Sequence, residues 1–177
     1  DDAKQRLIKM GEYEDKIHIT GCPSIDIAKQ VLDHSTLDFD PCQKYGGVGK
    51  YIDTSKDYLV VMQHPVTTEF EMSKLQAETL IKIIHELNMP VFWFWPNPDA
   101  GSDGTSNALR THREENPDNQ IRFFKNLEGA DFLKLLYHSK CLIGNSSVGI
   151  RECSYLGIPV VNIGSRQNRR LRGKNVI

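Results

Sequence analysis

The chain has 177 residues, 39% of them hydrophobic and 25% charged, and its formal net charge is -1. This balance is typical of one globular domain with a sizeable core, and the near-neutral charge excludes a global electrostatic attraction to nucleic acid or to membrane surfaces. No apolar run approaches the roughly 20 residues that a membrane-spanning helix requires, so we expect neither a nucleic-acid nor a membrane partner.

Short apolar runs alternate with longer segments of helical periodicity along the chain. In chain order, the apolar runs predict strands at residues 16–20, 58–64, 91–96, 121–124, 141–144 and 159–164. Helices are predicted over residues 24–33, 70–87, from the turn at 97–104 to Glu115, 129–138 and 146–156, and a Gly-rich loop over 35–57. The core-facing side of the helix over 70–87 is predicted to carry Leu75, Leu80, Ile83, Ile84 and Leu87.

This alternation predicts βαβ units, and therefore an α/β fold with a parallel sheet and helices on both faces. In open sheets of this kind, ligands bind beyond the carboxyl ends of the strands. The polar or Gly-rich segments that follow the strands are therefore the candidate site, namely residues 64–69, 97–104, 125–128, 144–147 and 164–167.

The cysteines bear on redox compartment and metal binding. Cys22, Cys42, Cys141 and Cys153 form no C-x-x-C pair and stand at no metal-ligand spacing with histidine. The pattern favours free thiols in a cytoplasmic protein that binds no metal and no cofactor.

The G-N-S-S sequence at residues 144–147 joins a predicted strand to a predicted helix. Unpaired backbone N–H groups at such a junction, together with the hydroxyls of Ser146 and Ser147, suit a phosphate group. Helix capping by Asn145 or Ser146 explains the same residues, and both interpretations stay open at this point. A hydrolase-type serine nucleophile needs a later acid and histidine, but residues 148–177 contain neither His nor Asp. A Walker A loop is excluded because no G-K-[ST] follows.

Three other side chains near these junctions have more than one interpretation. Glu152 suits ligand hydroxyls such as a ribose diol, or a pair with Arg151 on a solvated helix. Arg166 suits bidentate contact with a diphosphate, whereas the arginines after it favour a solvated loop over a nucleic-acid patch. His64 ends a strand, where it could donate to phosphate, act as an acid or base, or lie satisfied in the core.

The segments HPVTTE, PNPDAGS, GNSSVGIRE, GIPVVNIGSRQ and GKNV occur in this order. Together they resemble the hydrolysing UDP-N-acetylglucosamine 2-epimerases, and among these the branch that begins sialic and legionaminic acid synthesis. The resemblance covers nearly the whole chain. It implies the glycosyltransferase-B arrangement, two Rossmann-like domains with the active site between them, of which this chain matches the C-terminal one. On this basis we expect residues 1–15 to be an interdomain helix or linker remnant. Residues 16–177 are expected to form the UDP-binding domain, with the N-terminal catalytic domain absent.

The resemblance implies a UDP site made of His64, Asn97, Asn126, Ser146, Ser147, Glu152 and Arg166. In it the two serines hold the diphosphate, the glutamate takes the ribose hydroxyls, and the arginine and the histidine bind phosphate. The histidine also assists the departure of UDP. The two asparagines lie near the nucleotide, the second within the segment around Lys125–Leu127 beside the uracil.

The implied reaction eliminates UDP across C1–C2 of the sugar to give a glycal, and then adds water with inversion at C2. The carboxylates that remove the C2 proton are expected in the N-terminal domain, so this chain alone should bind UDP weakly and not turn over. The full-length protein is expected to be a homodimer or homotetramer acting on UDP-GlcNAc or a related UDP-diacetamido sugar. Two alternatives stay open, a glycosyltransferase-B type UDP-sugar transferase and a non-catalytic nucleotide-sensing module.

Overall fold

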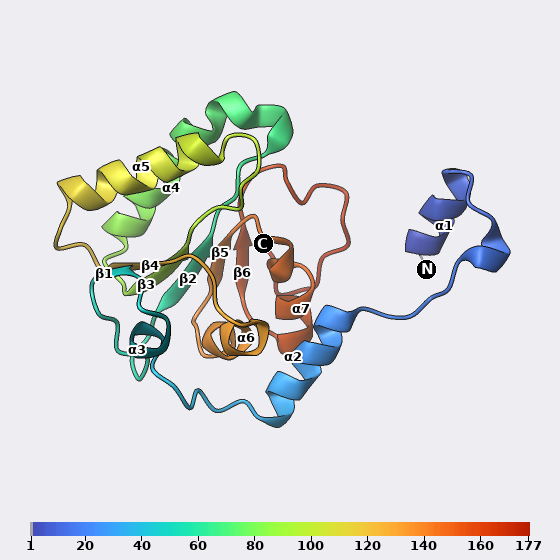
Figure 1. The fold of residues 1–177 in the computed structure, drawn as a ribbon, viewed down its shortest axis with the longest axis horizontal. Helices are drawn as coiled ribbons and strands as arrows, with labels where there is room; N and C mark the ends of the chain where they lie inside the picture. Colours follow the sequence, from blue (N-terminus) through green and yellow to red (C-terminus); the bar gives the residue numbers. More distant parts are fainter. Residues whose placement is uncertain (1) are drawn as a thin grey trace.

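A six-stranded sheet forms the centre of the computed structural model, which describes residues 2–177 (Figure 1). Its strands are β1 (Val48–Gly49), β2 (Leu59–Met62), β3 (Val91–Phe94), β4 (Ile121–Phe124), β5 (Leu142–Gly144) and β6 (Val160–Asn162). They lie in the order β1-β4-β3-β2-β5-β6, and all neighbours are parallel except β1 with β4. The predicted α/β class with a parallel sheet is therefore confirmed, with one antiparallel strand at its edge.

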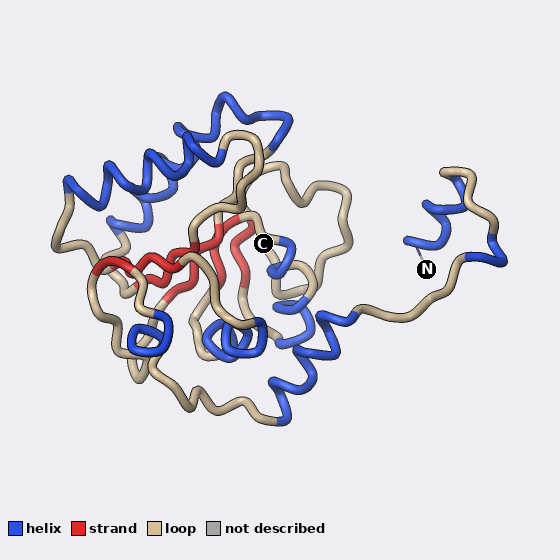
Figure 2. Tube along the Cα trace, viewed as in Figure 1, coloured by secondary structure: helices blue, strands red, loops and turns tan. Residues whose placement is uncertain are grey.

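Helices cover both faces of the sheet, as the βαβ pattern requires (Figures 1 and 2). One face carries α4 (Ser73–Glu86) and α5 (Ser102–Glu115), and the other carries α2 (Pro23–Asp33), α6 (Gly129–Tyr137) and α7 (Glu152–Leu156). The remaining helices are α1 (Asp2–Lys9), α3 (Pro41–Tyr45) and the short 3-10 helices η1 (Glu14–Lys16), η2 (Thr67–Met72) and η3 (Ser147–Gly149). Within residues 2–177, no helix combines the length and the apolar character needed to cross a membrane.

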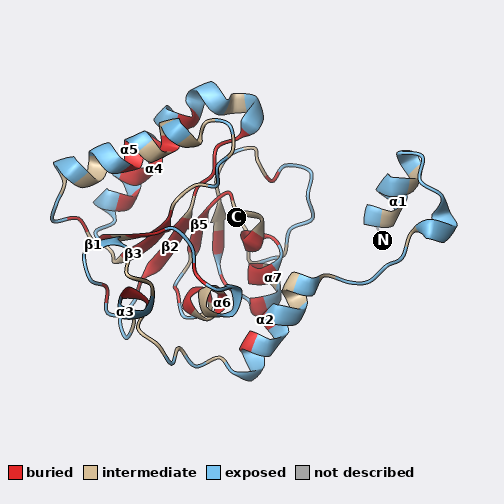
Figure 3. Ribbon diagram, in the orientation of Figure 1, coloured by how far each residue is buried: buried red, intermediate tan, exposed pale blue. Residues whose placement is uncertain are grey.

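Strands β2 to β5 are buried on both sides, which explains their mostly apolar sequences, whereas the edge strand β1 is exposed (Figure 3). Alternate side chains point to opposite faces, so Val60 and Phe92 join the cluster under α2 and α6, whereas Val61 and Trp93 join the cluster under α4 and α5. Each large apolar side chain buried in this way contributes about 1.5–3 kcal/mol to folding. The core therefore fixes the position of the carboxyl ends of the strands.

The predicted strand at residues 16–20 is absent, and this prediction was wrong. Lys16 is the last residue of η1, and residues 17–20 form an extended segment away from the sheet, in which Ile19 is 61% exposed (Figure 1). An extended segment becomes a strand only when a neighbour pairs with its N–H and C=O groups. Here no sheet strand lies alongside.

The predicted loop over 35–57 contains two elements, α3 and the edge strand β1. Asp40 caps α3, because its Oδ1 accepts hydrogen bonds from the N–H groups of Cys42 and Gln43 at 2.7 and 3.1 Å. Pro41 supplies the first helical position, where its missing N–H costs nothing. The D-P pair was therefore a helix start that the Gly-rich composition concealed.

The predicted core face of the helix over 70–87 was wrong at three of its five residues. Leu80 and Ile84 are buried as expected, but Leu75, Ile83 and Leu87 are each about half exposed. The buried stripe instead runs through Ala77, Leu80, Ile81 and Ile84, at helical spacings of three and four. A small residue, Ala77, lets the helix approach the sheet closely, so size as well as apolarity decided which face is buried.

Candidate functional site

The sheet has a topological switch point between β2 and β5. From β2 the chain steps to β3 and β4 on one side, and then returns to add β5 and β6 on the other. Loops leave the carboxyl ends of β2 and β5 in opposite directions at such a point, which opens a crevice for a ligand. His64 follows β2 and Asn145 follows β5, so the two segments that meet there both carry polar side chains.

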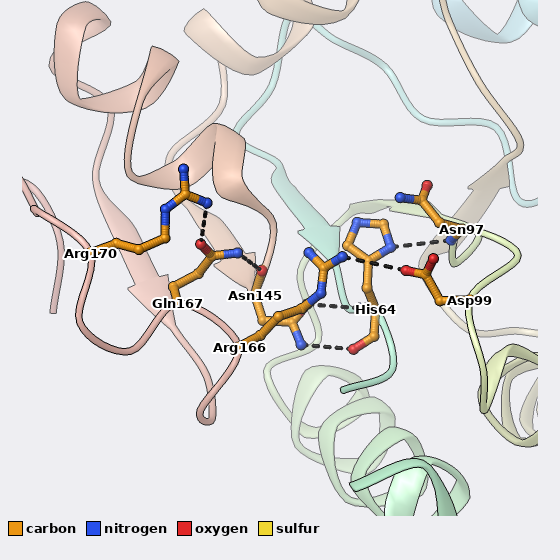
Figure 4. Close-up of polar contacts among 7 residues, drawn as sticks. All are labelled: His64, Asn97, Asp99, Asn145, Arg166, Gln167 and Arg170. Atoms are coloured by element: carbon orange, nitrogen blue, oxygen red, sulfur yellow. Dashed lines mark hydrogen bonds and ion pairs between the residues drawn. The ribbon is translucent and has the colours of Figure 1, made fainter. Parts of the chain in front are cut away.

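The side chain of Asn145 joins the ends of these two strands. Its Oδ1 accepts a hydrogen bond from the N–H of His64 at 2.8 Å, and its Nδ2 donates to the C=O of His64 at 2.7 Å (Figure 4). Its own N–H donates to the C=O of Met62 at 3.0 Å. Asn145 is completely buried, so these bonds are protected from water. The asparagine considered as a helix cap is instead a link to β2.

The imidazole of His64 is held in a defined state. Its Nδ1 accepts a hydrogen bond from the N–H of Asn97 at 3.2 Å, which leaves the proton of a neutral ring on Nε2 (Figure 4). Burial, and then the charge of Arg166, lower the pKa of His64 from 6.5 to about 4, although Asp99 acts in the opposite direction. At neutral pH His64 is therefore an uncharged ring whose Nε2–H is a hydrogen-bond donor.

This buried neutral histidine makes the fold sensitive to acid. Because the folded-state pKa lies below the ordinary value, the unfolded chain binds the proton first, so stability is full above pH 6.5 and falls as the pH drops toward 4. Between pH 7 and pH 5 we expect the free energy of unfolding to fall by about 2 kcal/mol through His64.

Urea unfolding of the wild type and of His64→Gln at both pH values measures this contribution. The exposed Gln5, which does not titrate, gives the control Gln5→Ala, which should keep the wild-type pH slope. Burial and the neighbouring His85 also lower the pKa of His112, and that part of the slope remains in both variants. An unchanged slope in His64→Gln would contradict the buried neutral state of His64.

Arg166 lies in the loop after β6, close enough to His64 for its charge to act on that ring. Its Nη2 is 3.4 Å from Oδ2 of Asp99, which follows β3, and both side chains are partly exposed (Figure 4). A pair of this kind is held weakly, and a diphosphate with several charged oxygens can take the place of the carboxylate. Arg166 therefore remains available to an anionic ligand.

The segment after β5 does not form the single helix predicted over 146–156. Residues 147–149 form η3, the backbone leaves the helical region at Arg151, and α7 begins only at Glu152. Gly149 is a poor helix residue and packs so closely on β6 that an added Cβ would lie 2.9 Å from Val160 Cγ1. The break therefore follows from the close approach of this turn to the sheet.

Of the two serines, Ser146 takes the capping role. Its Oγ accepts a long hydrogen bond, 3.5 Å, from the N–H of Val148. Ser147 and Glu152 lie near each other around a cavity of about 250 Å³ between α2, α6 and this turn. The other walls of the cavity include Ser24, Ile27, Gly129 and Phe132. Ser146 lines the same cavity while its Oγ caps η3.

Glu152 has one carboxylate oxygen without a partner. The residue is 6% exposed, and Oε1 lies 3.2 Å from the guanidinium of Arg151. Oε2 is buried and accepts no hydrogen bond from any residue that the structure describes. An unsatisfied buried acceptor costs about 1–3 kcal/mol, which is a reason to expect a donor from a ligand here.

The structure brings the predicted site residues into two groups. His64, Asn97 and Arg166 gather at the switch point, and Ser146, Ser147 and Glu152 line the cavity on the α2–α6 side. Asn126 is an exposed residue between β4 and α6, and it is not among the residues that line this cavity, although Gly129 is. No three His, Cys, Asp or Glu side chains in residues 2–177 gather closely enough to hold a metal ion, and all four cysteines are free thiols.

Sequence reasoning missed the hydrogen-bond and ion-pair partners of the residues at the switch point. Asp99 pairs with Arg166, and Gln167 donates from Nε2 to the C=O of Asn145 at 2.8 Å. Both residues lie in post-strand segments that the sequence had marked, 97–104 and 164–167. Their partners are distant in sequence, and only the strand order shows that the segments meet.

Comparisons with known proteins relate this chain to one family. The family model described as UDP-N-acetylglucosamine 2-epimerase matches residues 1–177. The chain is 34% identical over 176 residues to the hydrolysing UDP-N,N'-diacetylbacillosamine 2-epimerase of Legionella pneumophila, covering 99% of this chain and 44% of that protein. It is 32% identical over 178 residues to the UDP-N-acetylglucosamine 2-epimerase of Neisseria meningitidis serogroup B, covering 100% of this chain and 44% of that protein.

Solved structures share the fold. Two structures of the UDP-GlcNAc 2-epimerase of Methanocaldococcus jannaschii, one of them in complex with UDP-GlcNAc and UDP, superpose with TM-scores of 0.62 and 0.60. Their identities to this chain are 18% and 17%, so this likeness shows the fold alone. They cover 99% and 90% of this chain, and this chain covers 48% and 42% of theirs. The chain thus spans less than half the length of the relatives that it matches.

Proposed function

The chain belongs to the UDP-N-acetylglucosamine 2-epimerase family, and from this membership we propose that its residues 16–177 are the UDP-binding domain of a hydrolysing nucleotide-sugar 2-epimerase. Residues 1–15 would be the link to a second domain, which supplies the rest of the active site. The substrate would be a UDP-linked 2-acetamido sugar, the class to which the substrates named for the relatives belong.

The observation that carries the proposal is the buried Oε2 of Glu152, which accepts no hydrogen bond from the described residues. A buried carboxylate beside an anion site is unfavourable when the ligand offers only phosphate oxygens, because like charges repel. A ribose offers two hydroxyl donors next to its phosphates, and these would satisfy Oε2 of Glu152 while the diphosphate lies over Ser147. A nucleoside diphosphate therefore fits both the donors and the acceptor.

The diphosphate would be held by donors of four kinds. The hydroxyl of Ser147 and the backbone of η3 lie on one side. The neutral Nε2–H of His64 and the guanidinium of Arg166 lie on the other, with Asp99 giving up its pair when the ligand binds. Donors already oriented toward an anion stabilise the negative charge that grows on UDP as the C1–O bond breaks.

In the proposed reaction this chain therefore acts on the leaving group. As the C1–O bond breaks, the electron pair goes to UDP, while a base of the second domain takes the C2 proton to leave a glycal. Water then adds across the double bond, with the hydroxyl at C1 and the proton at C2. His64 is neutral before the ligand binds, so its Nε2–H would meet the diphosphate as a hydrogen-bond donor.

Calorimetric titration with UDP, against GDP and ADP, tests the proposal. For Glu152→Gln we expect UDP to bind about tenfold more weakly, because a charge-assisted hydrogen bond becomes a neutral one. The sharper test uses UDP that lacks both ribose hydroxyls. The wild type should discriminate against it, and Glu152→Gln should discriminate much less.

Matched variants and a second assay complete the design. Glu86, exposed at the end of α4, gives the control Glu86→Gln, which should bind UDP as the wild type does. Equal discrimination in the wild type and in Glu152→Gln would remove the ribose assignment. With the second domain restored, release of a free 2-acetamido sugar without an acceptor would separate an epimerase from a transferase.

A further inference from the structure

Asn145 connects two loops that the proposed UDP site needs. We propose that Asn145 is the positioning residue for His64, and that Gln167 fixes the loop that carries Arg166 to the same point. The proposal rests on the proposed UDP-binding function, and it adds two residues that touch no ligand themselves. It explains how donors from two loops keep a fixed spacing before UDP arrives.

The bonds of Asn145 continue the pairing of β2 and β5 past the point where the strands end. Backbone pairing ends with Met62 opposite Gly144, because the chain then turns away into η3. The Asn145 amide takes over, accepting from and donating to the main chain of His64 as a paired residue of a strand would. His64 is thereby fixed at its backbone, with Nδ1 facing the N–H of Asn97.

Gln167 attaches the next loop to the same point. It is 2% exposed, its Nε2 donates to the C=O of Asn145, and its Oε1 accepts from Nη1 of Arg170 at 2.9 Å (Figure 4). Arg166 is the preceding residue, so its backbone is held one position from this anchor. All polar groups of Asn145 are therefore engaged, with β2, with His64 and with the Arg166 loop.

A residue that only stabilises the fold could make the same hydrogen bonds as Asn145. Asn119 allows a stabilising role to be distinguished from a positioning role. Asn119 is also buried, at 6% exposure. Its Oδ1 accepts from the N–H of Ile121 at 2.9 Å, and its Nδ2 donates to the C=O of Asn116 at 2.6 Å. It thus repeats the two-bond pattern of Asn145, but it precedes β4, at the opposite end of the sheet from the site.

The experiment compares Asn145→Ala, Gln167→Met and the control Asn119→Ala by thermal unfolding, by UDP titration and by the ring ¹⁵N resonances of His64. We expect both alanine variants to lose thermal stability. UDP should bind at least about tenfold more weakly to Asn145→Ala and about threefold more weakly to Gln167→Met, and as in the wild type to Asn119→Ala. Only the first two should shift the His64 ring signals away from the Nε2–H tautomer.

The outcomes separate this proposal from the one on which it rests. Failure of the wild type to bind UDP would count against the proposed function, while the ring resonances, which need no ligand, would still judge the positioning role. A folded Asn145→Ala with wild-type ring signals would overturn that role. If Asn145→Ala does not fold, Gln167→Met is judged by the same two measurements, and wild-type values in both would overturn it.

Discussion

Replacing Gly144 with alanine is expected to lower the free energy of unfolding by about 4 kcal/mol, a large part of the stability of a domain of this size. Gly144 ends β5 with a φ of +136°, which side chains of L residues rarely adopt. A Cβ there would also lie against the C=O of Met62, which is backbone of the neighbouring strand and cannot rotate away. The strand ends that carry His64 and Asn145 would have to separate.

Gly157 provides the matched control for this expectation. It has a φ of +74° after α7, but nothing lies within 4 Å of an added Cβ. Gly157→Ala should therefore cost only the backbone strain, about 1–2 kcal/mol. Urea unfolding of both variants measures the difference, and equal losses would mean that β2 and β5 do not approach as closely as described. Gly144→Ala should also weaken UDP binding by those molecules that fold, because the proposed UDP site lies at the junction of β2 and β5.

The sequence predicts the sheet well because its signals there are local. The runs at 58–64 and 91–96 are mostly apolar and bounded by Pro or polar turns, and each became a strand with trimmed ends, while the run at 121–124 became a strand with the predicted bounds. Residues 16–20 carry a similar signal and form no strand. Pairing is a property of neighbours, and a short apolar run does not show whether a neighbour exists.

The location of the candidate site was predictable from the sequence, but the hydrogen bonds within it were not. Parallel strands bring their carboxyl ends to one edge, so the polar segments after them could be named from sequence. The role of Asn145 could not, because its partner His64 is 81 residues away and capping explained the local pattern equally well. The broken helix after β5 had the same origin, since the close contact of Gly149 with Val160 belongs to the packed sheet.

Arg166→Ala is expected to weaken UDP binding by about a hundredfold, since it removes the guanidinium proposed for the diphosphate. Arg166→Lys should recover part of this loss, because a lysine keeps the charge without the bidentate geometry. The control is the exposed Arg169, which has a φ of +62°; Arg169→Asn suits that backbone and should bind UDP normally. UDP titration measures all three variants, and a loss shared by Arg169→Asn would indicate a diffuse basic surface instead of one defined contact.

The same variant has a second consequence that requires no ligand. The charge of Arg166 helps to lower the pKa of His64, so Arg166→Ala should move that pKa upward from about 4 and reduce the loss of stability in acid. Removing the opposing carboxylate in Asp99→Asn should move the pKa of His64 in the other direction, and should strengthen UDP binding because the guanidinium no longer has to leave a partner.

NMR titration of the His64 ring in both variants measures these pKa shifts. If the two variants shift the pKa of His64 in opposite directions while changing UDP affinity in opposite directions, then Arg166, Asp99 and His64 form one electrostatic unit at the switch point. If the pKa does not move in either, the guanidinium lies too far from the imidazole in solution for both to contact one diphosphate.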